Sequence, residues 1–184
     1  MLSRIAQGDP SQITQSWLIC GPPGSGRSNM ARAFAAALES PDHGMSAEPT
    51  RVTQQVLAGT HPDVTVLTTN KVTIGIDQVR EIITTSEQMP ATAPWRIIII
   101  EDVDRMMERT TNVLLKEIEE PSPHTIWLLC APSAQDVLPT IRSRTRTVMR
   151  LGKFFSTDIT WRYPPLSCAT TSLTLFSSKN KKLL

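Results

Sequence analysis

Four isoleucines stand together at positions 97–100, directly after Arg96. A strand with one solvent-facing side alternates polar and apolar residues, so an unbroken β-branched run is typical of a strand that is buried on both faces. Such strands belong to parallel sheets, because the crossover helices that join parallel strands cover both faces. The run therefore predicts a strand inside a sandwich, with helices above and below the sheet.

Other segments supply the remaining layers of this sandwich. Further strands are predicted for short apolar or β-branched runs at residues 17–20, 64–67, 125–130 and 145–149. Helices are predicted where apolar residues recur at helical spacing or proline ends a helical pattern, at residues 28–38, 77–89 and 108–120. Residues 40–62 are polar and hold three prolines, so we expect an irregular connection there. This alternation predicts an α/β fold with a parallel sheet.

The last 35 residues differ from the rest of the chain. Residues 1–149 carry 13 basic and 16 acidic side chains, whereas residues 150–184 carry six basic side chains and one acidic one. Five of the nine aromatic residues lie in this second segment, where no helical or strand period persists. We therefore expect one domain at residues 1–149, with no nucleic-acid footprint in its charge, and an irregular tail at residues 150–184.

The sequence also predicts where the protein works. It has no apolar run of about 18 residues, which excludes a transmembrane helix, and its amino-terminal segment lacks the apolar centre of a secretory signal. Cys20, Cys130 and Cys168 do not have the spacing of metal ligands, and the first two lie in apolar runs that indicate buried thiols. We expect a cytoplasmic, reducing environment and no membrane contact.

The segment GPPGSGRS begins at Gly21 and nearly matches the phosphate-binding pattern G-x-x-x-x-G-K-[ST]. Gly21, Gly24 and Gly26 allow the backbone to turn so that its amides converge on an anion. The helix that follows adds the positive end of its dipole. The segment therefore predicts a phosphate-binding loop, and an ordinary glycine-rich turn between a strand and a helix is the alternative.

The end of this loop departs from the pattern. Ser28 stands where a hydroxyl group would contact a magnesium ion, but Arg27 replaces the lysine that reaches the terminal phosphates. Arginine keeps the charge but exchanges a slim ammonium group for a wide planar fork. We therefore expect ATP and magnesium to bind weakly at most, without efficient hydrolysis.

Glu101 and Asp102 directly follow the isoleucine run. P-loop proteins hold magnesium and polarise water with carboxylates at the end of a central strand. The usual order is Asp before Glu, and the reversed order moves each carboxylate by one methylene group, which matters for metal geometry. We include both residues in the predicted nucleotide site, which we regard as degenerate.

Five further segments are similar to a known family. They are THPDV at 60–64, IDQVREI at 76–82, IIIIEDVDRM at 97–106, TTNVLLKEIEEP at 110–121 and LPTIRSRTR at 138–146. In this order they resemble the AAA+ clamp-loader ATPases of bacterial replication, above all the delta-prime subunits of DNA polymerase III in their actinobacterial form. The resemblance covers about residues 1–149.

This resemblance implies a P-loop fold of the AAA+ or RecA-like kind, a three-layer sandwich with a parallel sheet. It also implies a subunit that does not itself hydrolyse ATP and that belongs to the DNA polymerase III holoenzyme, a nucleotidyltransferase complex. Its implied partners are the gamma/tau and delta subunits, and through the complex the sliding clamp and primed DNA.

Arg144 is the residue to which the resemblance assigns a function. Ser143, Arg144 and Thr145 match the family's S-R-C motif, in which the arginine projects toward the ATP of the neighbouring subunit. Such an arginine finger acts in trans by stabilising charge on the γ-phosphate. A surface arginine in a basic cluster with Arg142 and Arg146 is the alternative.

The chain also departs from the family, which often carries a zinc module with four cysteines after the first helix. Residues 40–62 contain no cysteine, and Thr50 and Thr53 stand where two of the four would be expected. His43 and His61 alone cannot form a tetrahedral site with four ligands. We therefore expect no zinc, and we interpret His61 as a turn or capping residue.

Both ends depart from the family as well. The amino-terminal segment is shorter than in the family, and the helical lid and collar domains are absent from residues 150–184. We hypothesise that a frameshift near residue 150 produced this tail. Three interpretations remain open: a truncated clamp-loader subunit that supplies Arg144 to a partner, a self-sufficient P-loop ATPase, and a non-functional truncated product.

Overall fold

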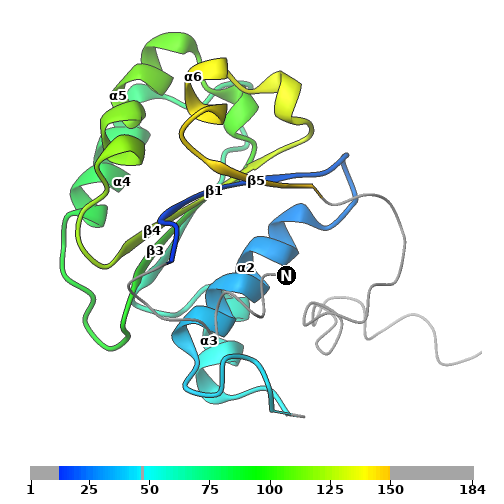
Figure 1. The fold of residues 1–184 in the computed structure, drawn as a ribbon, viewed down its shortest axis with the longest axis vertical. Coiled ribbons are helices and arrows are strands. Elements are labelled where there is room, and N and C mark those ends of the chain that lie inside the picture. Colours follow the sequence, from blue (N-terminus) through cyan, green and yellow to red (C-terminus); the bar gives the residue numbers. More distant parts are fainter. Residues whose placement is uncertain (1–12, 47, 150–184) are drawn as a thin grey trace, which may run out of the picture.

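The computed structural model describes residues 13–46 and 48–149, and these form three layers (Figure 1). The central layer is one sheet of five strands: β1 Ser16–Cys20, β2 Val64–Leu67, β3 Arg96–Ile100, β4 Thr125–Ala131 and β5 Arg146–Met149. Their order across the sheet is β2-β3-β4-β1-β5, and every neighbouring pair is parallel. The predicted α/β sandwich of the P-loop kind is therefore confirmed.

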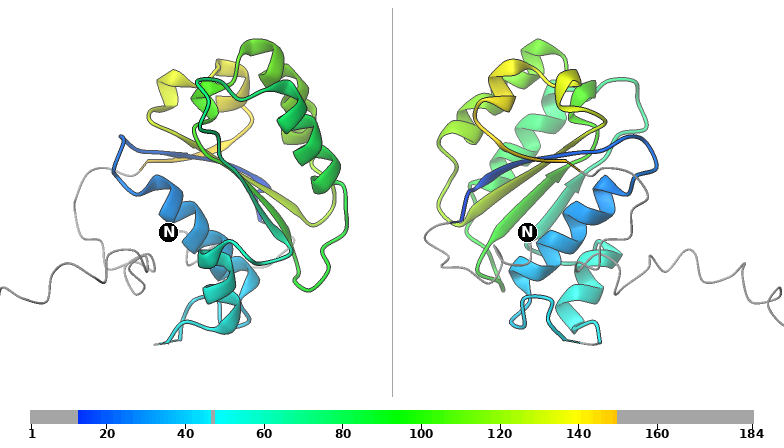
Figure 2. Two further views of the ribbon diagram at one scale, coloured as in Figure 1. Left: turned by 180° about the vertical axis from the view of Figure 1, so that it is seen from behind. Right: turned by 45° about the vertical axis from the view of Figure 1, so that its right-hand side comes forward.

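Helices cover both faces of the sheet. They are α2 Arg27–Glu39, α3 Arg51–Ala58, α4 Ile76–Ser86, α5 Glu108–Glu119 and α6 Pro139–Arg142. Helices α2 and α3 lie on one face, and α4, α5 and α6 lie on the other, as the views from two further sides also show (Figure 2). Within the described residues, no helix is long and apolar enough to cross a membrane.

The isoleucine run forms β3, which lies between β2 and β4. All four isoleucines are 0% exposed. Ile98 and Ile100 belong to the apolar core under α4 and α5, whereas Ile97 and Ile99 belong to the core under α2 and α3. Because burying one such side chain contributes about 1.5–3 kcal/mol, this strand holds the two outer layers on one sheet.

The prediction of an irregular connection at residues 40–62 was wrong, because this segment contains helix α3. Thr50 begins the helix, and its hydroxyl oxygen accepts a hydrogen bond from the Thr53 amide at 3.2 Å. Gly59 ends it with φ 70°, in the left-handed region that glycine adopts without steric cost. A threonine before a helix and a glycine after it are ordinary cap signals. We nevertheless expected a loop because the segment contains three prolines.

The helix predicted at residues 77–89 ends earlier, at Ser86. Residues 88 and 89 do not continue the helix. Their carbonyl groups accept hydrogen bonds from the Arg96 guanidinium at 3.4 Å and 2.9 Å. A tertiary contact therefore ends this helix before the proline that follows it in the sequence. The predicted tail at residues 150–184 lies outside the described residues.

Asp63 and Arg96 form a buried ion pair at 3.5 Å, at the starts of β2 and β3. Asp63 also accepts hydrogen bonds from the backbone amides of residues 91–93 at 2.6–3.2 Å. The pair thus fixes the connection between α4 and β3 against the sheet. Removing one partner would leave a buried charge, which typically costs about 3–5 kcal/mol.

Candidate nucleotide site and exposed arginine

The phosphate-binding loop lies at the carboxyl end of the parallel sheet. It begins directly after Cys20, and the Gly21 amide donates a hydrogen bond to the Ala131 carbonyl at the end of β4, at 3.1 Å. Gly24 and Gly26 have φ values of 76° and 81°, which a residue with a side chain adopts only at a cost. The amides of the first turn of α2 have no acceptors within the helix, so the backbone here fits an anion.

Arg27 turns back into the loop. Its guanidinium donates a hydrogen bond to the Gly21 carbonyl at 3.1 Å and forms an ion pair with Asp102. Asp102 has φ 54°, a left-handed conformation at the end of β3. Only 12% of the Arg27 side chain is exposed, so the cation at the lysine position is bound to its own protein. Ser28 follows it, half-buried, in the first turn of α2.

A second arginine of α2 pairs with the other predicted carboxylate. Arg32 contacts Glu101 at 2.9 Å, and Arg105 contacts Asp102 at 3.5 Å. Nearby, burial raises the pKa of Asp104, and the negative charge of Asp102 raises it further. Three cations and three carboxyl groups thus meet at this edge of the sheet: Arg27, Arg32, Arg105, Glu101, Asp102 and Asp104.

The structure therefore brings together all seven residues that we predicted for the nucleotide site. The glycine loop fits a phosphate group, but magnesium would have to displace an arginine from Asp102 or Glu101. Arg32 was not predicted as a partner of this site. A basic residue in the second turn of a helix carries no signal of its own, and only the fold shows which carboxylate it meets.

Arg144 lies apart from these residues. It follows α6, its side chain is 39% exposed, and its guanidinium donates a hydrogen bond to the Thr140 carbonyl at 3.0 Å. It also forms an ion pair with Glu119, the last residue of α5. The sequence analysis did not identify Glu119, because the two residues are 25 positions apart and meet only through packing.

Strand pairing fixes where Arg144 lies relative to the loop of its own chain. Arg146 pairs with Trp17 near the amino end of β1, so Arg144 lies beyond that end of the sheet. Gly21 follows the opposite end of the same strand. Five strand residues at about 3.3 Å each separate the two edges by roughly 16 Å, which is beyond the reach of an arginine side chain.

The two neighbouring arginines have contacts of a different kind. Arg142 donates a hydrogen bond to the Ala134 carbonyl at 3.4 Å. The Arg146 guanidinium lies over the Trp17 ring, 5.1 Å from its centre, as in a cation–π contact. The predicted basic cluster therefore exists on the surface, and Arg144 is the member that is paired with a carboxylate.

The segment that we compared with a zinc module is held together by hydroxyl groups. Thr50 Oγ1 lies 2.9 Å from Ser40 Oγ and 3.0 Å from Thr53 Oγ1, which links the end of α2 to the start of α3. His61 Nδ1 accepts a hydrogen bond from the Asp63 amide at 3.2 Å, in agreement with its interpretation as a turn residue. Within residues 13–46 and 48–149, no group of three or more His, Cys, Asp or Glu could hold a metal.

Two predicted thiols lie in the core. Cys20 and Cys130 are free and buried, and burial raises the pKa of both, that of Cys130 to about 12. These thiols therefore stay protonated at neutral pH and act as small apolar side chains.

Comparisons with known proteins agree with this architecture. The family described as DNA polymerase III, delta subunit, matches residues 1–153. The delta-prime subunit of Pseudomonas aeruginosa is 33% identical over 141 residues, and that of Escherichia coli is 31% identical over 133 residues. The alignments cover 74% and 70% of this chain, but only 43% and 40% of those proteins. The chain thus spans less than half the length of these relatives.

Solved structures show the same fold. A gamma-subunit-related DNA polymerase III protein of Thermotoga maritima matches with a TM-score of 0.59 and 25% identity, over 83% of this chain and 45% of that one. The RuvB branch-migration motor of the same organism matches with a TM-score of 0.50 and 14% identity, over 84% of this chain and 42% of that one, and this shows likeness of fold alone. The family match and the delta-prime relatives agree with the resemblance seen in the sequence, and the chain belongs to the DNA polymerase III delta-subunit family.

Proposed function

We propose that this chain supports ATP-driven loading of the sliding clamp onto primed DNA, as a delta-prime-like subunit in the cytoplasm. It would assemble with gamma/tau and delta subunits. It would act by placing an arginine at the ATP of a partner and not by hydrolysing ATP itself. Its family membership supports this role in replication. The buried free thiols of Cys20 and Cys130 fit a reducing compartment.

The observation that carries the proposal is the internal pairing of the phosphate loop. Arg27 is bound to Asp102 and to the Gly21 carbonyl, and Arg32 is bound to Glu101. Hydrolysis needs a cation on the terminal phosphates and carboxylates on magnesium and water. Here Arg27 is paired with Asp102, and Glu101 is paired with Arg32, so we infer that the chain does not hydrolyse ATP.

Arg144 would be the residue that this chain places at the ATP of its partner. It is exposed at the edge of the sheet opposite its own phosphate loop, so its target must lie on another subunit. There its guanidinium would stabilise the charge that develops on the γ-phosphate of the partner's ATP. To do so it would exchange the carboxylate of Glu119 for the phosphate oxygens, and both groups are anions that accept hydrogen bonds from a guanidinium group.

A measurement of ATP turnover by the purified chain alone separates this proposal from a self-sufficient ATPase. We expect no turnover above background. Turnover that is lost in the Arg27→Ala variant would support an ATPase and contradict the proposal.

Assembly separates the proposal from a non-functional product. We expect the chain to co-elute with gamma/tau and delta subunits of the same organism in size-exclusion chromatography. A folded chain that elutes alone at every mixing ratio would contradict a role in the ring.

A further inference from the structure

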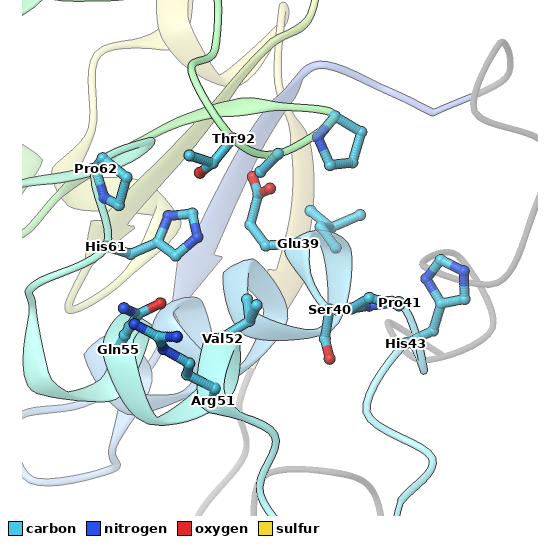
Figure 3. A pocket seen from close by; sticks show the side chains of 13 residues that line it. Glu39, Ser40, Pro41, His43, Arg51, Val52, Gln55, His61, Pro62 and Thr92 are labelled. Atoms are coloured by element: carbon cyan, nitrogen blue, oxygen red, sulfur yellow. The ribbon is translucent and has the colours of Figure 1, made fainter.

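A pocket of about 510 Å³ lies between the carboxyl end of α2, helix α3 and the segment that carries Thr92 (Figure 3). Glu39 at the end of α2 and Arg51 and Gln55 of α3 are among its lining residues. The pocket is distinct from the phosphate loop, because Arg27 and Glu39 are the two ends of α2, about 18 Å apart at 1.5 Å per residue.

Glu39 is the unusual member of this lining. It is only 5% exposed, and its carboxyl group is directed at the segment that carries Thr92 (Figure 3). Neither carboxyl oxygen has a hydrogen-bond partner of ordinary geometry within residues 13–46 and 48–149. A Trp95 backbone group interacts with this carboxyl but does not satisfy it by ordinary hydrogen-bond geometry. A buried carboxyl group that is not fully hydrogen-bonded costs folding free energy, and a bound ligand is one explanation for its presence.

The surroundings of Glu39 explain its protonation state. Burial raises its pKa to about 8, and the negative charge of Asp63 raises it too, while a backbone group of Trp95 and the charge of Arg96 act in the opposite direction. Arg96 compensates this carboxyl only in part, because its nitrogens are bound to Asp63 and to three backbone carbonyls. A ligand could supply the missing positive charge.

The other charged or titratable groups around the pocket do not fill this role. Burial lowers the pKa of His61, and its Nδ1 accepts the Asp63 amide hydrogen, so this imidazole is neutral above pH 7. His43 and the exposed Arg51 are lining residues, and no hydrogen bond or ion pair joins either to Glu39 in the described part of the chain. Burial would also raise the pKa of Asp63, but hydrogen bonds from residues 91 and 92 lower it, so Asp63 stays ionised.

We propose that this pocket binds an ammonium or guanidinium group, with the Glu39 carboxylate as its counter-ion. Both oxygens of Glu39 are closed off from solvent in this structure, so the side chain would have to turn toward the pocket for the charged group to donate hydrogen bonds to them. Leu38, Val52 and Pro94 provide apolar walls that suit an aliphatic stem. A free alkylamine and a lysine or arginine side chain of a peptide share this chemistry.

The test is a titration of the full-length chain with n-butylammonium and butylguanidinium, followed through the carboxyl carbon signal of isotopically labelled Glu39 by NMR. With a pKa of about 8, the ionised fraction of Glu39 rises from roughly one tenth at pH 7 to nine tenths at pH 9. We therefore expect both cations to bind about tenfold more tightly at pH 9. Affinity that is unchanged or lower at pH 9 would overturn the proposal.

Two variants and a neutral probe test whether the charge of the ligand and the Glu39 carboxylate are needed for binding. We expect n-butanol to leave the Glu39 signal unchanged, and Glu39→Gln to weaken cation binding, followed by backbone amide signals, at least tenfold. Glu81→Gln, which removes an exposed carboxylate of α4, should bind as the wild type does. Equal binding of butanol, or unaltered affinity in Glu39→Gln, would overturn the proposal. Tighter binding of a lysine-containing tripeptide than of butylammonium would identify a basic side chain as the source.

Discussion

At the scale of the residue, the Arg27 guanidinium contacts two acceptors at once, the Gly21 carbonyl and the Asp102 carboxylate. This bridge depends on nitrogen donors held apart in one plane, and the single ammonium group of lysine does not have that geometry. The side chain at this position therefore decides whether the Asp102 carboxylate is engaged with the phosphate loop, in addition to its weaker contact with Arg105.

Replacing this arginine by lysine tests that interpretation. We expect Arg27→Lys to raise the affinity for magnesium-ATP by about tenfold, because a charged hydrogen bond worth about 1.5 kcal/mol no longer competes with the nucleotide. Equilibrium binding of a fluorescent ATP analogue would measure the change. Arg80→Lys on the exposed side of α4 is the matched control and should leave the affinity unaltered. Equal affinity in wild type and Arg27→Lys would contradict the inference.

Glu39 gives the stability of the protein a dependence on pH. Its folded-state pKa of about 8 lies above the ordinary value of 4.5, so the folded state keeps a proton that the unfolded state releases. Rising pH therefore favours unfolding, by up to about 1.4 kcal/mol per pH unit between roughly pH 5 and 8.

Urea denaturation at pH 5, 6, 7 and 8 would measure this loss. The Glu39→Gln variant lacks the titrating group, and its free energy of unfolding should fall less over the same range. If wild type and variant lose stability in parallel from pH 5 to pH 8, the account of this carboxyl group is wrong.

At the scale of the element, helix α3 depends on its two caps, because an eight-residue helix is too short to be stable alone. Gly59 has φ 70°, and no atom lies within 4 Å of the position that a Cβ atom would occupy. Any cost of Gly59→Ala must therefore come from the backbone and not from a steric clash.

We expect Gly59→Ala to lower the free energy of unfolding by about 1 kcal/mol, because alanine is strained in the left-handed region. Gly75→Ala is the matched control, since Gly75 begins α4 with φ −75°, and we expect a change of less than about 0.5 kcal/mol. Chemical denaturation measures both variants. Equal effects of the two substitutions would show that the conformation of Gly59 is not what ends α3.

The elements that could be predicted from the sequence are those whose local pattern coincides with their packing. The isoleucine run is buried throughout, and the strand at Val64–Leu67 forms where it was predicted, with Val64 and Leu67 buried. Helix α6 was missed because its four residues are too few to show a helical period. The end of α4 was misplaced because a contact with Arg96, a residue of another element, decides it.

At the scale of the whole molecule, the same distinction applies to the candidate site. The phosphate loop and the acids after β3 could be predicted, since a short motif and a strand end suffice to place them. The ion pairs Arg27–Asp102 and Arg144–Glu119 could not, because they join residues 75 and 25 positions apart through the fold. The Arg27–Asp102 pair bears on whether the phosphate loop could act on a nucleotide, and the motif alone does not reveal it.

The two candidate sites lie at opposite edges of the sheet. The carboxyl edge carries the internally paired phosphate loop, and the amino edge carries Arg144. In the proposed ring, Arg144 would face the nucleotide of the next subunit, and this chain would contribute only the arginine. Arg144 would therefore act on the ATP of a partner.

The most direct measurement is the rate of ATP hydrolysis by gamma/tau in the assembled complex, with clamp and primed DNA present. We expect wild-type chain to stimulate hydrolysis, and Arg144→Ala to assemble equally well but to reduce the stimulated rate by about tenfold or more. Arg142→Ala, two residues away on the same exposed surface, should stimulate as the wild type does. Full stimulation by an assembled Arg144→Ala variant would contradict the account.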